Sequence, residues 1–297
     1  SIFPSDEITL AFLKAQDRAD DWTEILPDPD AQYDEVIDID LCALEPMAAC
    51  PHMPDKVKTT EEIGKIKVDQ VAIGSCTNSS FVDMMKVAKI LKGKTVCPTV
   101  SLCIAPGSKQ VLTMLAQEGL LEPLIGSGAR LLECSCGPCI GSGGAPVTSG
   151  VSARTFNRNF EGRSGTADAK VYLVSPETAV AAALTGEITD PRDLGLDALH
   201  VDLPERFLID DSAVLAPASP EEAAHLDVLR GPNIKEFPQG KPVGDTITAK
   251  LTLKVGDNIT TDHIMPAGSK ILPYRSNIPK LSEFCFAVCD KEFAKNA

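Results

Sequence analysis

The stretch VDQVAIGSCTNSSFVDMMKVAKIL, residues 68–91, decides the fold. Residues 68–73 predict a strand, and residues 80–91 carry apolar side chains at the spacing of a helix. The residues between them, GSCTNS, form a turn rich in glycine and in helix-capping side chains. A strand that leads through such a turn into a helix is the building unit of α/β proteins.

The same alternation continues along the chain. The sequence predicts strands over 99–105, 130–134 and 170–174 and helices over 108–117 and 178–184. Alternating strands and helices indicate an α/β fold with a doubly wound, mainly parallel sheet. In such sheets the functional loops lie beyond the carboxyl ends of the strands.

The flanking regions differ from this regular part. Towards the N-terminus we expect a helix over 5–17 and a strand over 36–41. Residues 205–245 are rich in proline and predict a long connector. From residue 246 a β-rich unit is expected, running through 246–255 and on to 269.

Composition and charge narrow the function classes. The chain has 297 residues and a formal net charge of −14, without a visible basic patch, so a nucleic-acid partner is not expected. No apolar run approaches the roughly 18 residues of a membrane span, so no membrane partner is expected either. The first residues do not resemble a secretory signal and include no initiator Met, which predicts an excised or processed fragment.

The ten cysteines need an explanation. Without an export signal, most are expected to be small buried hydrophobic residues in a reducing, cytoplasmic compartment. A disulfide framework is not expected in a chain with this much core material. Metal binding or catalysis is then the question for the cysteines in polar, glycine-rich surroundings.

One such cysteine is Cys76, in the turn between the first predicted strand and its helix. Backbone N–H groups and the positive end of the helix favour a thiolate there. The neighbouring Thr77 and Asn78 add hydroxyl and amide groups. The same residues would also serve as an ordinary helix cap beside an inert cysteine.

A second site follows the strand predicted over 130–134, in the sequence CSCGPCIGSGG of residues 134–144. The Cys-x-x-Cys spacing of Cys136 and Cys139 lets two thiolates bind one metal or cluster. A thioredoxin-type redox pair is an alternative, although Ser135 precedes the motif and a glycine-rich loop follows it. A zinc site lacks an evident fourth ligand, and the glycines match no complete phosphate-binding fingerprint.

A third site is TFNRNFEGR, residues 155–163. Arg158 and Arg163 lie five residues apart among asparagine and glycine, which suits guanidinium groups that bind carboxylates. The alternative is a surface loop with two solvated arginines. Each motif alone could be an ordinary structural feature, such as a helix cap or a surface loop. The three motifs together and in this order indicate a functional site far more specifically.

These motifs together resemble the aconitase family. The resemblance rests on four segments: GSCTNS (74–79), CGPCIG (136–141), NRNFEGR (157–163) and DNITTDH (257–263). By this resemblance Cys76, Cys136 and Cys139 hold a 4Fe-4S cluster. It further implies that Arg158 and Arg163 bind substrate carboxylates, that Asn78 and Asn157 lie beside the cluster, and that Asp262 belongs to the active-site shell.

The resemblance also implies a domain plan. Residues 1–38 would be the tail of a preceding α/β domain, 39–205 the cluster-binding α/β domain, 206–245 a linker, and 246–297 the start of a swivel domain. The family's N-terminal part and the later swivel domain, which holds the catalytic serine, have no counterpart here. We therefore expect the fragment to be inactive alone and to need the remaining aconitase domains as partners.

The expected activity is that of aconitate hydratase in the tricarboxylic acid cycle, which converts citrate to isocitrate through cis-aconitate. Three thiolates would leave one iron of the cluster open as a Lewis acid for this small tricarboxylate substrate. Ser79-Ser80 and the swivel motif within the same chain favour aconitase. Homoaconitase and isopropylmalate isomerase are alternatives of the same class, and an RNA-binding iron sensor or a thioredoxin-like reductase would be of another class.

Overall fold

The computed structural model describes residues 2–196, 199–266 and 271–297. The chain forms two compact units, Ser1–Val214 and Leu215–Ala297, each described by itself. The finer division predicted from the sequence, at residues 38, 205 and 245, stays a prediction. No helix in the described part of the chain is long and apolar enough to cross a membrane.

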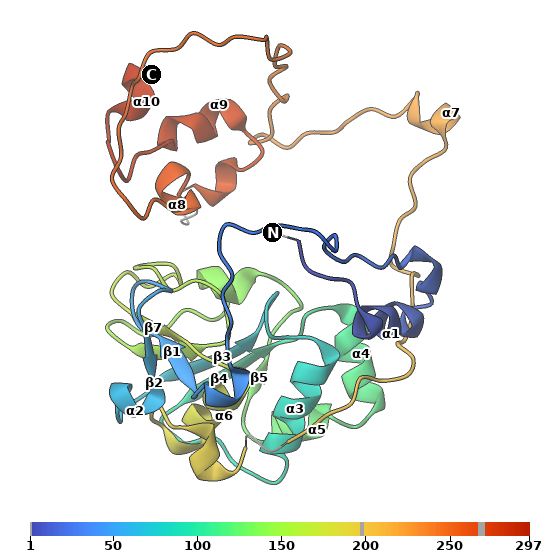
Figure 1. Cartoon of the computed structure of the whole chain (residues 1–297), viewed down its shortest axis with the longest axis vertical. Helices are drawn as coiled ribbons and strands as arrows, with labels where there is room; N and C mark the ends of the chain where they lie inside the picture. Colours follow the sequence, from blue (N-terminus) through green and yellow to red (C-terminus); the bar gives the residue numbers. More distant parts are fainter. Residues whose placement is uncertain (1, 197–198, 267–270) are drawn as a thin grey trace. The chain divides into compact units, whose positions relative to one another are not determined.

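The first unit is built on a mixed sheet of seven strands in the order β2-β1-β7-β6-β3-β4-β5 (Figure 1). The strands β3 to β7 run parallel to one another, and β1 pairs antiparallel with both β2 and β7. The strands are β1 (Met47–Ala49), β2 (Val57–Thr59), β3 (Gln70–Gly74), β4 (Ser101–Ala105), β5 (Arg130–Leu131), β6 (Val151–Arg154) and β7 (Lys170–Leu173). This confirms the predicted α/β class with a mainly parallel sheet.

The helices of this unit connect and cover the strands. They are α1 (Glu7–Ala15), α2 (Thr60–Ile63), α3 (Phe81–Leu91), α4 (Lys109–Gln117), α5 (Leu121–Gly126) and α6 (Pro176–Thr185), with 3-10 turns η1 (Ala19–Asp21), η2 (Leu41–Ala43), η3 (Gly137–Ile140) and η4 (Pro191–Leu194). Local chemistry sets their ends. Ser80 and Asp83 form a capping box at the start of α3, and α6 runs from a Ser175 cap to a left-handed Gly186.

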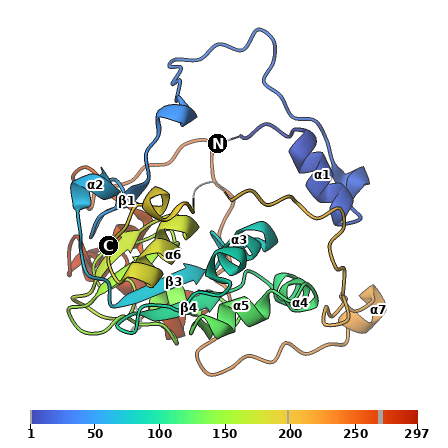
Figure 2. The same ribbon diagram turned by 90° about the horizontal axis from the view of Figure 1, so that it is seen from below.

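The two faces of the sheet are covered differently because side chains alternate along each strand. Val71 and Ile73 of β3 belong to the main core, together with buried residues of α3, α4, α5 and α6. Ala72, between them, packs in a small second cluster with Cys139 and Phe156. Figure 2 shows α3 and α6 beside the central strand β3. The second face is thus covered by the loops that carry the candidate site residues.

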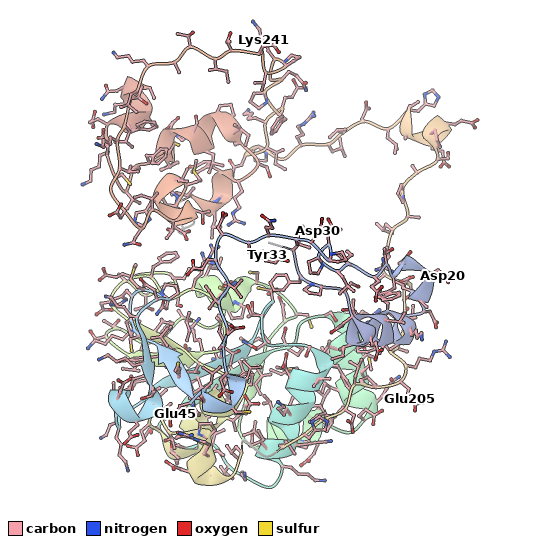
Figure 3. The ribbon with its side chains drawn as sticks, viewed as in Figure 1. Asp20, Asp30, Tyr33, Glu45, Glu205 and Lys241 are labelled. Carbon is pink, nitrogen blue, oxygen red and sulfur yellow. The ribbon has the colours of Figure 1, made fainter. Side chains whose placement is uncertain are left out.

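The strand predicted over 36–41 was wrong. These residues form extended chain without strand pairing, and η2 begins at Leu41. Val36 and Ile37 are 71% and 73% exposed, and no described segment pairs with this stretch as a strand would require. Figure 3 labels Asp20, Asp30 and Tyr33 on this N-terminal segment, which runs outside the sheet.

The second unit contains short helices. These are α7 (Pro220–Ala223), α8 (Thr261–Ile264), α9 (Ile278–Leu281) and α10 (Phe293–Asn296), with 3-10 turns η5 (Leu272–Tyr274) and η6 (Ser282–Phe284). The β-rich unit expected from residue 246 differs from this: residues 246–255 are extended and largely exposed, without a pairing strand among the described residues. Residues 267–269 of that expectation lie outside the described part.

Candidate active site

The candidate residues of the first unit lie on loops at one edge of the sheet. The strands β3, β5 and β6 run in the same direction, so their carboxyl ends meet at this edge. Along the chain, the sheet grows from β3 through β4 to β5 and then returns to β6 on the other side of β3. The order therefore reverses between β3 and β6, which is where α/β sheets bind their ligands.

The first loop leaves β3 through a tight turn. Gly74 has φ +111° and lies against Ala105, so that an added Cβ would overlap the carbonyl oxygen of that residue. Ser75 follows in a left-handed conformation and donates its N–H to the Ala105 oxygen at 2.9 Å. This turn presents Cys76 and Thr77 to solvent just before α3 begins.

The second loop, residues 132–150, follows β5 and contains the three closely spaced cysteines, and we call it the cysteine loop. Its single turn of 3-10 helix, η3, ends at Gly141 in a left-handed conformation. Cys139 is buried against Ala72 of β3, whereas Cys136 is exposed and Cys134 is half-buried. Burial raises the pKa of the Cys134 thiol, which does not favour a thiolate at that position.

The third loop leaves β6 and contacts both of the others. The Asn78 side-chain amide donates to the backbone oxygen of Thr155 at 2.6 Å, and the Thr155 hydroxyl accepts from the Gly74 N–H at 2.9 Å. Arg163 Nη2 donates to Cys139 Sγ at 3.5 Å. The first and third loops are therefore joined through Asn78, and the second and third through Arg163.

Of the predicted site residues, Asn78, Cys139 and Arg163 are thus linked by direct contacts between loops. The others in the first unit lie on the same loops: Cys76, Cys136 and Asn157 are exposed, and Arg158 is half-buried. Asp262 belongs to the second unit, where it is part of α8. Among the described residues no three His, Cys, Asp or Glu side chains are grouped as metal ligands.

The chemistry of the donor set, three thiols near a guanidinium, is of the kind that holds an iron–sulfur cluster. Cys76 and Cys136 are exposed on neighbouring loops of one sheet edge, and the third thiol, Cys139, accepts a hydrogen bond from a cation. Arg163 Nε is buried without a hydrogen-bond partner, which leaves a donor available for a negatively charged group. Thiolates and a nearby guanidinium are the groups that bind an anionic cluster or a carboxylate.

Three buried polar residues of this region were not predicted from the sequence. Asn159 is 0% exposed, and its side-chain amide donates to the backbone oxygens of Ala49, Cys50 and Val171. Arg154 and Gln70 lie buried on the sheet face below the cysteine loop and hydrogen bond to each other. Gln70 within the apolar run of β3 was the available signal, since a polar side chain in a buried strand requires a partner.

Burial also changes the acidity of Arg154. It lowers the pKa of the guanidinium to about 10, while the sulfurs of Cys139 and Cys103 act in the opposite direction. The side chain remains protonated at neutral pH. It is therefore a permanent positive charge beneath the cysteine loop.

Comparison with known proteins shows what these motifs are similar to. Residues 56–186 match the model of the aconitase family (aconitate hydratase). This range includes β3, the cysteine loop, β6 and the loop that carries both candidate arginines.

Several curated proteins are similar to the chain. The 3-isopropylmalate dehydratase large subunit of Moorella thermoacetica is 41% identical over 194 residues, which cover 65% of this chain and 46% of that protein. The large subunit from Clostridium kluyveri is 42% identical over 194 residues, again 65% of this chain and 46% of the relative. Large subunit 1 of Thermotoga maritima is 42% identical over 194 residues, 64% and 46% respectively. The chain spans about half the length of these relatives.

Proposed function

We propose that this chain is part of a hydro-lyase that dehydrates and rehydrates a hydroxy acid, because its residues 56–186 match the model of the aconitase family. The relatives are named 3-isopropylmalate dehydratase, which supports 3-isopropylmalate as the substrate rather than citrate. The expectation of citrate and the tricarboxylic acid cycle thus has less support than its alternative. The observation that carries the proposal is the contact of Arg163 with Cys139 between two loops at one sheet edge.

The proposed cofactor is a 4Fe-4S cluster held by Cys76, Cys136 and Cys139. When bound, such a cluster supplies an iron with an open position, a Lewis acid for the departing hydroxyl group. Two of these thiols are exposed, and the third is buried beside Arg163. The presence of three thiols near a positively charged side chain supports this assignment.

The proposed substrate contacts are the two arginines. Isopropylmalate carries two carboxylates, one fewer than citrate, and a pair of guanidinium groups would orient both and offset their charge. Arg163 has its Nε buried and without a partner, so it has a hydrogen-bond donor left for a carboxylate oxygen. We assign Arg158 the same role because it lies on the same loop, five residues earlier.

The remaining assignments extend this site. Asn78 is fixed by Thr155 and would support the cluster or the substrate together with Asn157. Asp262, in α8, is assigned to the active-site shell only by the family resemblance, and this role stays a proposal. By analogy with the relatives named large subunits, we propose that a small subunit, or an equivalent domain, supplies the groups for proton transfer.

Iron binding tests the cofactor assignment. The chain is reconstituted anaerobically with ferrous iron and sulfide. The iron and sulfide bound per chain are then counted, and the electron paramagnetic resonance spectrum is recorded. We expect about four irons per chain. Cys76→Ser, Cys136→Ser and Cys139→Ser should each abolish this uptake, whereas Cys134→Ser, in the same loop, should retain it. Equal losses in all four variants, or a folded wild type without iron, would contradict the assignment.

Substrate choice is tested separately, with the protein combined with its partner parts. The ultraviolet absorbance of the unsaturated product is followed with 3-isopropylmalate, citrate and homocitrate as competing substrates. We expect the highest kcat/KM for 3-isopropylmalate. A preference for citrate would return the assignment to aconitate hydratase without affecting the cluster ligands.

A further inference from the structure

Arg154 joins three segments of the first unit from a fully buried position. It is the last residue of β6, and its side chain is 0% exposed. Nε donates to Ser152 Oγ at 2.9 Å, and Nη1 donates to the backbone oxygen of Pro138 at 2.7 Å. Nη2 donates to Gln70 Oε1 at 2.7 Å and to the backbone oxygen of Gly144 at 2.6 Å. One guanidinium therefore connects β3 and β6 with two points of the cysteine loop, Pro138 and Gly144.

The loop that it holds has little other regular structure. It follows a two-residue strand, β5, and contains one short 3-10 turn and four glycines between residues 137 and 144. Glycines increase the freedom of such a segment, so fixed contacts are needed to keep one conformation. The Pro138 and Gly144 carbonyls lie on either side of Cys139, and Gln70 Nε2 adds a second donor to Gly144 at 3.3 Å.

The charge of Arg154 lacks the usual compensation. A buried cation is costly unless a negative group lies close to it. Among the described residues no carboxylate acts on Arg154, and the groups that raise its pKa, against the larger effect of burial, are the side chains of Cys139 and Cys103. The Phe156 ring, 5.4 Å from the guanidinium carbon, adds a cation–π contact. The charge is therefore directed towards the sheet face on which Cys139 lies.

We propose that Arg154 is the positioning residue of the cysteine loop: two of its four hydrogen bonds hold the backbone of that loop at Pro138 and Gly144, the other two anchor the guanidinium to β3 and β6, and its charge compensates the thiolates when they bind metal. The first half concerns the protein without metal. The second half rests on the proposed function, because it requires Cys136 and Cys139 to be cluster ligands. The two halves are therefore tested by separate measurements.

The first measurement is hydrogen exchange of the metal-free chain, read at the amides of residues 137–144. Arg154→Met removes all four hydrogen bonds, and Arg154→Lys retains the charge but not the planar fork. Since each charge-assisted bond stabilises the closed loop, we expect exchange to accelerate about tenfold or more in both variants. Unchanged protection in folded variants would overturn the positioning role.

Arg130→Lys is the matched control. Arg130 Nη2 donates to the backbone oxygen of Gly143, in the same loop, at 2.6 Å, but this hydrogen bond is exposed. Water replaces an exposed donor, so exchange should change by less than about threefold. If circular dichroism shows that the Arg154 variants do not fold, Ser152→Ala removes one buried acceptor and should accelerate the same amides by a smaller factor. No acceleration there would equally overturn the proposal.

The second measurement is the reduction potential of the reconstituted cluster. If Arg154 had only a structural role, this potential would not depend on whether residue 154 carries a positive charge. Arg154→Lys should retain the wild-type potential, whereas Arg154→Met should shift it to more negative values because a nearby positive charge is lost. Equal potentials in the Lys and Met variants would overturn the charge role. A wild type without iron would overturn the proposed function, and hydrogen exchange then decides the positioning role alone.

Discussion

Gly141→Ala offers a sharp test of how the cysteine loop is packed. Gly141 ends η3 with φ +91°, a conformation that costs a residue with a Cβ about 1–2 kcal/mol. The new methyl group would also overlap the carbonyl oxygen of Ser164 and lie 2.7 Å from Gly165 Cα. Both contacts are with backbone, so one loop must move, and overpacking of this kind costs about 1–3 kcal/mol. The expected loss in the free energy of unfolding is therefore roughly 2–5 kcal/mol.

Gly143→Ala supplies the comparison from the same loop. Gly143 also has a positive φ, +73°, but nothing lies within 4 Å of an added Cβ. This variant should lose only the conformational part, about 1–2 kcal/mol. Urea unfolding of the metal-free chain, followed by far-ultraviolet circular dichroism, gives both values.

Alkylation of Cys139, which is buried in the wild type, gives a second readout. It should become faster in Gly141→Ala because the loop must move away from Ser164. Equal unfolding free energies for the two glycine variants, with Cys139 still protected, would refute the packing of residues 137–144 against 162–165.

Three further predictions concern other parts of the first unit. Burial raises the pKa of Glu177, but the 2.9 Å hydrogen bond from Lys86 and the local backbone outweigh it, so the pKa of this carboxyl is lowered in the folded protein. A carboxyl with a lowered pKa stabilises the folded state at pH values above the pKa that it has in the unfolded chain, and this stability is lost as the pH falls through the folded-state pKa. In urea unfolding, Glu177→Gln should therefore cost free energy at pH 7, and this cost should disappear as the pH is taken below 4.5. Arg163→Lys should leave the cluster spectrum unchanged but raise KM, and loss of the cluster would contradict its role. Asn159→Ala should cost about 2–4 kcal/mol in thermal or urea unfolding, since three backbone oxygens lose their buried donor; a loss below about 0.5 kcal/mol would contradict this.

The strands and helices with a clear periodicity were predictable from the sequence. The helix expected over 80–91 is observed as α3 (Phe81–Leu91), and the strand expected over 99–105 as β4 (Ser101–Ala105). The strand β6 (Val151–Arg154) was not predicted, because Ser152 and Arg154 interrupt the apolar pattern. Arg154 is buried with hydrogen bonds to the cysteine loop, and Ser152 is buried with hydrogen bonds to Arg154 and Gln70. These are tertiary effects that local periodicity does not contain.

The candidate site was predictable in its position but not in its contacts. Parallel strands place the residues after their carboxyl ends at one edge, so the loops with Cys76 and Cys136 were expected to lie near each other. The arginine motif was placed there only by the family resemblance, because β6 was not predicted. The hydrogen bond between Arg163 and Cys139 depends on how two loops fold over the sheet, which a single sequence does not specify. The roles given to all the predicted site residues stay proposals: Asn78, Cys76, Cys136, Cys139, Asn157, Arg158, Arg163 and Asp262.

The outer strands of the sheet have a consequence for how copies of this protein behave in concentrated solution. The strand order ends in β2 on one side and β5 on the other, and these strands are only three and two residues long. Lys58 lies within β2 and Lys56 just before it, so that border also carries positive charge. Short, charged borders offer a neighbouring chain few free backbone groups to pair with. We therefore expect the first unit to resist edge-to-edge aggregation.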